Sequence, residues 1–362
     1  MKMAKAAVFT SIGEPMELLG LPIPELKTGE ILIKVEYTTL CRSDLNTYCG
    51  KRTEPTPTIL GHESVGRVVA FGPQATKTDL RNEPIDTGDR LSWAIFASDP
   101  DSSLAQLGIP QKGTGLFKYG HERLNGESVL HGGLGEYIIL RQHTPVLKVN
   151  ESVPVKIAAI INCAVATVAG AIRLAGAIEG KDILVSGAGM LGMIACAMLK
   201  TNGAASVTAL DINEQRLSHA RVYGADKTLL IDDDLESRVF SNFQNSRPFH
   251  VVIELSGVAK SMERTLDLLS VGSTAVWVGA TYPERNISFS AENVVRNLLT
   301  VKGLHNYNRE DFLTAVEFIE ENHDAFPFGE MVYDQFNLNE VNEAFEYGLR
   351  MNPFRVGIKI SD

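Results

Sequence analysis

The sequence predicts an α/β protein, with a β-rich domain followed by a doubly wound parallel sheet, and three observations support this class. Residues 1–150 contain short β-like runs that glycine and proline interrupt repeatedly. From about residue 153 alanine becomes frequent, and strands then alternate with helices, which is typical of a parallel sheet. The length of 362 residues favours two domains, at roughly 150 residues per domain.

The β-rich part is predicted from three apolar or alternating runs, Ile31–Val35, Ser64–Phe71 and Tyr137–Leu140. An alanine-rich helical stretch covers residues 153–175. The strands predicted for the parallel sheet are Asp182–Ser186, Ser206–Leu210, Val251–Leu255, Thr274–Val278 and Leu299–Gly303.

Helices are predicted between these strands, and they include a helix that ends at Lys200, Asn213–Tyr223 and Lys260–Leu269. The tail adds helices over Arg309–Asn322 and Leu338–Arg350 and a strand over Arg355–Ile360. We expect this tail to pack back on the first domain. The acidic cluster Asp232–Asp234 is interpreted as a solvated loop rather than a metal site.

The charge balance argues against polyanionic partners. The chain has 34 Lys and Arg residues against 44 Asp and Glu, a net charge of -10, which disfavours nucleic acid or an anionic membrane surface. The apolar stretch Ile157–Ile172 is too short and too interrupted for a membrane span, and Ala6–Phe9 is too brief for a signal peptide. We therefore expect a cytoplasmic protein. Its four cysteines, Cys41, Cys49, Cys163 and Cys196, are too widely spaced for a disulfide framework.

Three glycines predict a dinucleotide site. Gly187, Gly189 and Gly192 form G-x-G-x-x-G directly after an apolar strand and open a helix. The first glycine permits a tight turn, the second lets the backbone approach a pyrophosphate, and the third lets helix and strand pack closely. A plain turn between strand and helix is the alternative interpretation.

Asp211 ends the next predicted strand, where a carboxylate can accept hydrogen bonds from both ribose hydroxyls and repel a 2′-phosphate. This favours NAD over NADP. Arg216 lies further along the chain and keeps NADP open as the less favoured cofactor. A helix N-cap is the alternative role for Asp211.

Cys41, His62 and Cys163 come from three separate segments and make a ligand set suited to zinc. Three protein ligands leave a fourth position for water or substrate, as in a catalytic site. Glu63 and Asp44 are expected beside the metal, with Asp44 orienting the imidazole. The alternative is that both thiols are small buried hydrophobic groups and that His62 is a strand-edge histidine.

These residues resemble a known family. Cys41-Arg42-Ser43-Asp44, Gly61-His62-Glu63, Cys163 and the glycine cluster resemble the zinc-dependent alcohol dehydrogenases of the medium-chain dehydrogenase/reductase superfamily, over essentially the whole chain. Within it, residues 43–63, 116–122 and 187–192 are similar to dehydrogenases associated with phosphonate catabolism.

The resemblance implies a GroES-like catalytic domain over residues 1–165 and 304–362 around a Rossmann NAD-binding domain over residues 166–303. It implies that Cys41, His62, Cys163 and, as an exchanging ligand, Glu63 bind one catalytic zinc. Ser43 would pass the substrate proton and Thr167 would face the nicotinamide. The implied cofactor contacts are Arg42, Gly187, Gly189, Met190, Leu191, Gly192, Asp211, Arg216, Gly279 and Arg355. Arg42 and Arg355 would hold the pyrophosphate, and a plain surface charge is the alternative for both.

The sequence departs from the family in two places. Where many relatives hold a structural zinc with four cysteines, this chain has Asp99, Ser102, Ala105 and Gly113, so we expect no structural zinc. Asn46 replaces a histidine that carries the proton to solvent, and an amide cannot shuttle protons. His121, His131 and His305 are candidates for that step.

The expected function is hydride transfer between NAD(H) and a small alcohol, aldehyde or ketone. A dehydrogenase specific for a phosphonate-bearing alcohol is the first alternative, because Lys51, Arg52, Lys118 and His121 could hold an anion. A solvated surface is the other interpretation of these four residues, and it is slightly favoured. The others are a metal-free reductase of the same superfamily and an inactive NAD-binding regulatory protein. Relatives are commonly dimers or tetramers that pair sheet edges, and Thr274–Gly279 is the candidate edge.

Overall fold

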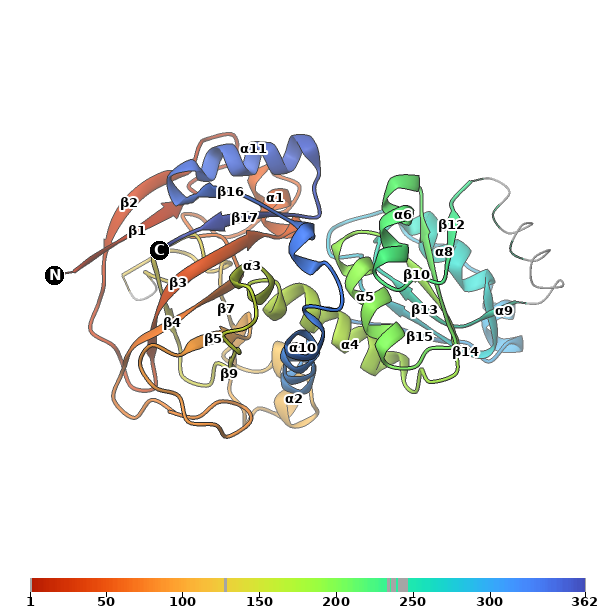
Figure 1. Cartoon of the computed structure of the whole chain (residues 1–362), viewed down its shortest axis with the longest axis horizontal. Coiled ribbons are helices and arrows are strands. Elements are labelled where there is room, and N and C mark those ends of the chain that lie inside the picture. The colour runs from red at the N-terminus through yellow and green to blue at the C-terminus, as the bar shows by residue number, and fades with distance from the viewer. Residues whose placement is uncertain (1, 127–128, 233–234, 236–238, 240–246, 362) are drawn as a thin grey trace. The chain divides into compact units, whose positions relative to one another are not determined.

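The computed structural model describes residues 2–126, 129–232, 235, 239 and 247–361, and it divides into two compact units. Unit 1 comprises Met1–Ala166 and Asn308–Asp362, and unit 2 comprises Thr167–Tyr307. In Figure 1 the red and orange N-terminal strands and the blue C-terminal segment share unit 1, so the tail returns to the first domain. The predicted limits at 165 and 303 differ from these by one and four residues. Of the acidic cluster Asp232–Asp234, positions 233 and 234 lie outside the described residues.

Unit 1 is built on a seven-stranded sheet in the order β16-β17-β3-β4-β5-β9, with β8 also paired to β3. These strands are β3 (Ile31–Leu40), β4 (Glu63–Phe71), β5 (Arg90–Trp93), β8 (Tyr137–Leu140), β9 (Val146–Lys148), β16 (Val332–Asn337) and β17 (Arg355–Lys359). Two smaller sheets pair β1 (Met3–Val8) with β2 (Glu17–Pro22) and β6 (Phe96–Ala97) with β7 (Phe117–Lys118).

The helices of unit 1 are mostly short. They are α1 (Arg42–Tyr48), α2 (Ser103–Gln106), α3 (Val155–Ala158), α10 (Arg309–Asn322) and α11 (Val341–Met351), with 3-10 turns η1 (Pro110–Lys112), η3 (Phe328–Met331) and η4 (Leu338–Glu340) and a π-helical turn η2 (Ile161–Val165). Helix α11 packs on β17, and its buried Phe345 and Val341 join Ile33 and Trp93 in one hydrophobic core. The tail therefore completes the core of the N-terminal domain.

Unit 2 is a parallel six-stranded sheet in the order β12-β11-β10-β13-β14-β15. Its strands are β10 (Asp182–Ser186), β11 (Ser206–Asp211), β12 (Lys227–Leu230), β13 (Phe249–Glu254), β14 (Leu269–Trp277) and β15 (Thr300–Gly303). Its helices are α4 (Ala166–Ala175), α5 (Met190–Thr201), α6 (Glu214–Val222), α8 (Ala259–Asp267) and α9 (Ala291–Arg296). The strand order reverses between β10 and β13, and in such sheets ligands bind there, at the carboxyl ends of the strands.

One prediction about the elements is wrong. Thr274–Gly279 is not a sheet edge, because β14 pairs with β13 on one side and β15 on the other, and the described edge strands are β12 and β15. The predicted helical stretch 153–175 is helical from Val155 to Ala175, with the π-helical turn Ile161–Val165 between α3 and α4. A π-helical turn inside a helical stretch frequently marks a functional site.

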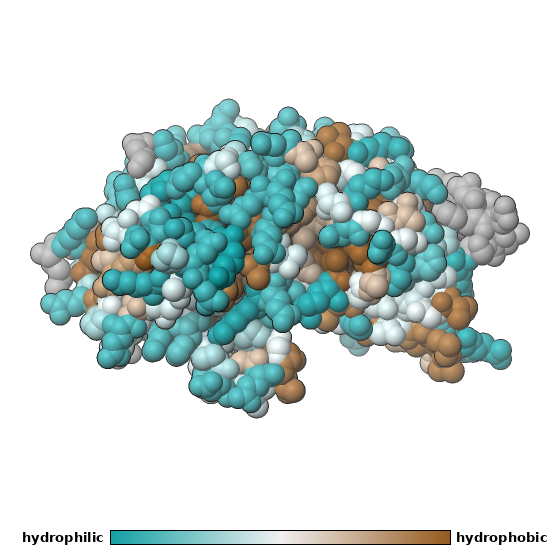
Figure 2. Space-filling model, turned by 60° about the horizontal axis from the view of Figure 1, so that its bottom comes forward, coloured by the Kyte–Doolittle hydropathy of each residue, from teal (hydrophilic) through white to brown (hydrophobic). Residues whose placement is uncertain are grey.

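The helical stretch Val155–Ala175 is apolar enough and long enough to cross a membrane, but 78% of its most apolar window is buried inside the protein. The apolar composition of this stretch is therefore explained by its burial in the protein core. In the face shown in Figure 2, hydrophilic residues predominate and hydrophobic residues form small separate patches.

Candidate metal and dinucleotide sites

Strand register brings the first metal-ligand candidates together. In the antiparallel pair of β3 and β4, Thr39 lies opposite Glu63. Cys41 follows β3 and His62 precedes β4, so the two side chains meet at the same end of the ladder. On the other side of β3, Val356 of β17 lies opposite Leu40, which places Arg355 beside Cys41.

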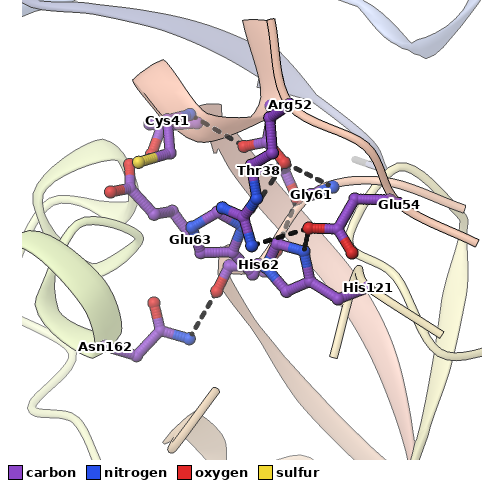
Figure 3. Close-up of polar contacts among 12 residues, drawn as sticks. Thr38, Cys41, Arg52, Glu54, Gly61, His62, Glu63, His121 and Asn162 are labelled. Carbon is purple, nitrogen blue, oxygen red and sulfur yellow. Dashed lines mark hydrogen bonds and ion pairs between the residues drawn. The ribbon is translucent and has the colours of Figure 1, made fainter. Parts of the chain in front are cut away.

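Cys163 reaches the same place from the π-helical turn η2. The ligand atoms of Cys41, His62, Glu63 and Cys163 all lie within 4.8 Å of one another. Figure 3 shows Cys41, His62 and Glu63 converging from the two strand ends. The structure therefore brings together the four residues that the family resemblance assigned to zinc.

Asp44 holds the imidazole of His62. Its Oδ1 lies 3.3 Å from His62 Nδ1, and its Oδ2 accepts a hydrogen bond of 2.9 Å from the backbone N–H of Cys41. Burial alone lowers the pKa of His62, but Asp44 and Cys41 outweigh burial and raise that pKa well above its usual value. With Asp44 at Nδ1, the other ring nitrogen is the one oriented for a metal.

The two thiols are partly buried and form a hydrogen-bonded pair. A hydrogen bond from Cys163, together with the charge of Arg355 and His62, lowers the pKa of Cys41 well below its usual value despite burial. The same hydrogen bond raises the pKa of Cys163. Cys41 is therefore the sulfur that is deprotonated first, and a thiolate is the form that binds a metal.

Glu63 is bound by Arg355 and Thr39. Arg355 Nε and Nη2 donate to the two carboxylate oxygens at 2.7 and 2.9 Å, and Thr39 Oγ1 donates at 2.7 Å. Burial raises the pKa of Glu63 although Arg355 opposes the shift. Arg355, which we predicted to hold the pyrophosphate, is itself buried with 5% exposure and also lies 3.8 Å from the sulfur of Cys41. Its role toward the cofactor stays a prediction.

Asn162 is a site residue that the sequence analysis missed. It is fully buried, and its amide nitrogen donates to the backbone carbonyls of His62 (3.1 Å) and Trp93 (2.9 Å). These carbonyls lie where the ladder between β4 and β5 has ended, so Asn162 supplies the donors that the strands no longer supply. Figure 3 shows its amide pointing at the His62 carbonyl. Because Cys163 is the next residue in the chain, Asn162 connects two of the metal-ligand candidates, His62 and Cys163. In the sequence, its position directly before that cysteine was the only sign of a role in the site.

The donor set suits a catalytic zinc. Two thiols and one imidazole are the ligands of several catalytic zinc sites, and a tetrahedral ion leaves a fourth position that Glu63 or a substrate can take. The two thiols, the imidazole and the carboxylate are all electron-pair donors, and they lie close together with little exposure to water. Burying such donors costs free energy unless a cation or hydrogen bonds compensate.

Other predicted residues of unit 1 lie on or beside α1. Ser43 is half-buried, and Arg42 is exposed at the first position of the helix. The backbone carbonyl of Asn46 accepts from the Cys49 thiol at 3.7 Å and from the Arg52 N–H at 3.1 Å. The proton and pyrophosphate roles of Ser43 and Arg42 stay predictions.

A charged cluster lies against the metal-ligand group. The ring centroid of His121 is 4.9 Å from that of His62, and its Nδ1 is 3.1 Å from Glu54, which also pairs with Arg52 at 2.6 Å (Figure 3). Burial, together with Lys112 and Arg52, lowers the pKa of Lys118 to about 8. The cluster thus holds more cationic than anionic side chains.

The lobe over residues 99–113 is closed by hydrogen bonds at positions where relatives carry thiolates. Ser102 Oγ donates to the carbonyl of Asp99 at 2.8 Å and accepts from the N–H of Ala105 at 3.4 Å, which caps α2. Gly113 packs against the Ser102 hydroxyl, so a side chain there would collide with it.

The glycine turn of unit 2 has the required close approaches. Gly187 has φ +100°, a conformation that favours glycine, and a Cβ on Gly192 would lie 2.0 Å from the Gly187 carbonyl oxygen. A Cβ on Gly189 would meet no atom within 4 Å, so this position is open. Met190 and Leu191 begin α5 directly after it.

Asp211 ties this turn to β11. Its Oδ2 accepts from the N–H of Ala188 at 2.7 Å and its Oδ1 from the N–H of Asn213 at 2.9 Å. The N-cap of α6 is Asn213, so the alternative role of Asp211 as that cap is wrong. Arg216 lies in the first turn of α6, Thr167 is buried at the start of unit 2, and Gly279 follows β14. Their cofactor contacts stay predictions.

Comparison with known proteins agrees with both halves of this arrangement. Residues 27–151 match the alcohol dehydrogenase GroES-like domain, and residues 191–321 match the zinc-binding dehydrogenase family. Together the two matches cover most of the chain. The chain belongs to the zinc-type alcohol dehydrogenases of the medium-chain superfamily. The predicted class, a GroES-like domain with a Rossmann-type parallel sheet, is thereby confirmed.

Individual members of this family extend the likeness over the full length. The chain is 26% identical over 335 residues to an L-threonine 3-dehydrogenase of Aeromonas hydrophila, covering 91% of each chain. An alcohol dehydrogenase structure from Thermotoga maritima superposes with a TM-score of 0.92 at 24% identity, over 100% of both chains. A zinc-binding dehydrogenase from Sinorhizobium meliloti bound to NADP has a TM-score of 0.85 at 21% identity, covering 99% of this chain and 100% of that one. The narrower resemblance to phosphonate-associated dehydrogenases stays a prediction.

Replacing Asn162 should loosen the metal site. In Asn162→Asp the group keeps its shape but cannot donate to the carbonyls of His62 and Trp93, so we expect zinc affinity to fall by about tenfold or more. Competition with a chelating dye measures the affinity, and the visible spectrum of the cobalt-substituted protein reports ligand geometry. Ser92→Ala is the matched control, because it removes a buried hydroxyl of the same unit that has no hydrogen-bond partner among the described residues. Equal affinity and equal spectra for wild type and Asn162→Asp would contradict this role.

Two glycine substitutions should have different effects. Gly192→Ala forces a methyl group against the Gly187 carbonyl, so we expect a loss of about 1–3 kcal/mol in stability and a lower melting temperature. Gly189→Ala meets no neighbour and should melt like wild type, but its methyl group occupies the space predicted for the pyrophosphate and should weaken NADH binding. Calorimetry and NADH fluorescence titration measure the two effects. If Gly189→Ala bound NADH as wild type does, the predicted path of the pyrophosphate would be wrong.

Proposed function

We propose that this oxidoreductase transfers a hydride between NAD(H) and the carbinol carbon of a small alcohol, in either direction, at a single zinc held by Cys41, His62 and Cys163. The observation that carries the proposal is the convergence of these ligand atoms, with those of Glu63, within 4.8 Å. Neither a metal-free reductase nor a purely regulatory dinucleotide-binding protein needs such a set.

When bound, zinc would supply a Lewis acid for the substrate oxygen, and the nicotinamide would accept or donate the hydride. The chain's own residues hold and orient the groups that would bind the metal. Asp44 fixes the imidazole of His62, and Arg355 holds the carboxylate of Glu63, which is close enough to exchange as a ligand. Ser43 would take the substrate proton at its hydroxyl, and Thr167 would face the nicotinamide, both on the pattern of the family.

We propose NAD rather than NADP as the cofactor. Support comes from Asp211, whose carboxylate stands at the end of β11 where a 2′-phosphate would be repelled. Ile212 follows with 75% exposure and offers no charge to a phosphate. The Sinorhizobium meliloti relative was solved with NADP, so this choice needs the direct comparison of both cofactors.

Purified protein should change NADH absorbance with at least one member of a panel of alcohols, polyols, hydroxyalkyl phosphonates and their carbonyl counterparts. The double variant Cys41→Ala/His62→Ala should lose zinc and turnover. It should still bind NADH, because the glycine turn lies in unit 2. Turnover that survives the double substitution would contradict a zinc mechanism. NADH binding to wild type without turnover on any substrate would favour the regulatory alternative.

The second candidate function is a dehydrogenase for an alcohol that carries an anionic group, such as a phosphonate. It is favoured by the cationic excess of Arg52, Lys112 and Lys118 next to His121 and the metal-ligand candidates. Burial, followed by the charges of Lys112 and Arg52, depresses the pKa of Lys118, although Glu54 and Glu122 oppose the shift. A bound anion would relieve the repulsion among the cations.

An anionic substrate should show a pH dependence that a neutral one lacks. Lys118 is charged below a pKa of about 8, so KM for a hydroxyalkyl phosphonate or sulfonate should rise as the pH increases through that value. Lys118→Met should abolish this rise and increase KM about tenfold at lower pH, while KM for a neutral alcohol of equal length changes little. The sulfonate keeps its charge throughout and controls for titration of the phosphonate. Equal KM changes for charged and neutral substrates would contradict the anion site.

A further inference from the structure

Glu254 is a buried acid that the proposed mechanism does not use. It ends β13, which together with β10 flanks the point where the strand order of unit 2 reverses. The residue is 0% exposed, and burial raises the pKa of its carboxyl group. A buried acid at the carboxyl end of a central parallel strand calls for a structural reason.

The partners of its carboxylate are neutral donors. Oε1 accepts from the N–H and the hydroxyl of Ser256, with the N–H at 3.0 Å, and lies 3.5 Å from the Ser186 hydroxyl. Oε2 accepts from the N–H of Gly257 at 3.1 Å. Ser186 is the last residue of β10 and precedes Gly187, so the carboxylate connects the turn after β13 with the start of the glycine turn.

The main chain of the same residue binds a third turn. The carbonyl of Glu254 accepts from the N–H groups of Val278 (2.9 Å) and Gly279 (3.2 Å), which follow β14. Leu255, the next residue, donates its N–H to the Ser186 carbonyl at 2.8 Å. One residue and its neighbour thus join the ends of β10, β13 and β14.

The three turns are packed backbone against backbone. A Cβ on Gly187 would lie 2.9 Å from the nitrogen of Ser256, and a Cβ on Gly257 would lie 2.3 Å from the Gly279 carbonyl oxygen. A Cβ on Gly279 would lie 2.2 Å from the nitrogen of Gly257. At these three glycines backbone faces backbone, with no glycine side chain to fix the distance between the turns. Hydrogen bonds are therefore needed to hold the turns together.

We propose that Glu254 is a positioning residue for the dinucleotide: its carboxylate holds the turn after β13 against the start of the glycine turn after β10, and so keeps the nucleotide-binding edge of unit 2 preformed. This rests on the proposed function, because it assumes that the dinucleotide binds at that edge. The residue acts through backbone groups and does not itself have to touch the cofactor. Preformed sites bind more tightly because less ordering accompanies binding.

The test compares Glu254→Ala and Glu254→Gln with wild type in the full-length, zinc-loaded protein. Alanine leaves the N–H groups of Ser256 and Gly257 without their acceptor, and we expect the NADH dissociation constant to rise about tenfold or more. Glutamine keeps one acceptor oxygen and should recover part of that loss. Zinc content, set in unit 1, should stay at the wild-type level. With any substrate found, KM for NAD should rise while kcat and KM for the alcohol stay within about twofold.

Thr208→Val is the matched control, since it removes a buried hydroxyl of β11 in the same sheet. In the part of the chain that the structure describes, this hydroxyl has no hydrogen-bond partner. If Glu254→Ala does not fold, the NADH affinity of Glu254→Gln serves as the test. Wild-type affinity for NADH in a folded Glu254→Ala, or in Glu254→Gln where alanine does not fold, would overturn the inference and leave the proposed function standing. A loss shared equally by NAD and alcohol kinetics would do the same. Failure of the wild type to bind either NADH or NADPH would overturn both.

Discussion

The meeting of two thiols, an imidazole and a carboxylate in the buried end of one β-ladder is the constraint on which unit 1 depends. Ligand atoms within 4.8 Å of one another repel or compete for protons unless other groups compensate. Asp44 and Arg355 compensate from two sides, and Asn162 holds the backbone. A divalent cation at the centre would be held by Cys41, His62 and Cys163, with Glu63 as an exchanging ligand. The returning tail places Arg355 on the Glu63 carboxylate.

The dinucleotide site of unit 2 follows a different physical logic. Its turns offer N–H groups and bare backbone rather than charged side chains, and close approach is possible because glycines stand at the contacts. Rigidity therefore has to come from side chains behind the turns. Asp211 and Glu254 both do this, because each binds backbone N–H groups at a strand end. In unit 1 the strand register brings the metal-ligand candidates together. In unit 2 the glycine turns leave room for a ligand beside the backbone.

Periodicity in the sequence predicted most strands of the parallel sheet, because buried parallel strands are continuous apolar runs. In the parallel sheet it missed Lys227–Leu230, which is short and mixed in polarity. In unit 1 it missed several short strands, among them Arg90–Trp93. The metal ligands could be predicted only from the family resemblance. The spacing of residues in the sequence does not reveal how distant strands pair, and this pairing is what brings the ligands together. Asn162 and Glu254 were missed because their function lies in backbone groups that they bind, and the π-helical turn at Ile161–Val165 has no breaker in its sequence. The supposed edge at Thr274–Gly279 was wrong because β15 covers it.

X-ray absorption at the zinc edge of the purified, untagged protein tests the central claim most directly. The account predicts one zinc per chain with two sulfur neighbours at about 2.3 Å and one or two nitrogen or oxygen neighbours at about 2.0–2.2 Å. A shell of nitrogen and oxygen alone, or a folded protein that retains no zinc when supplied with it, would contradict the account.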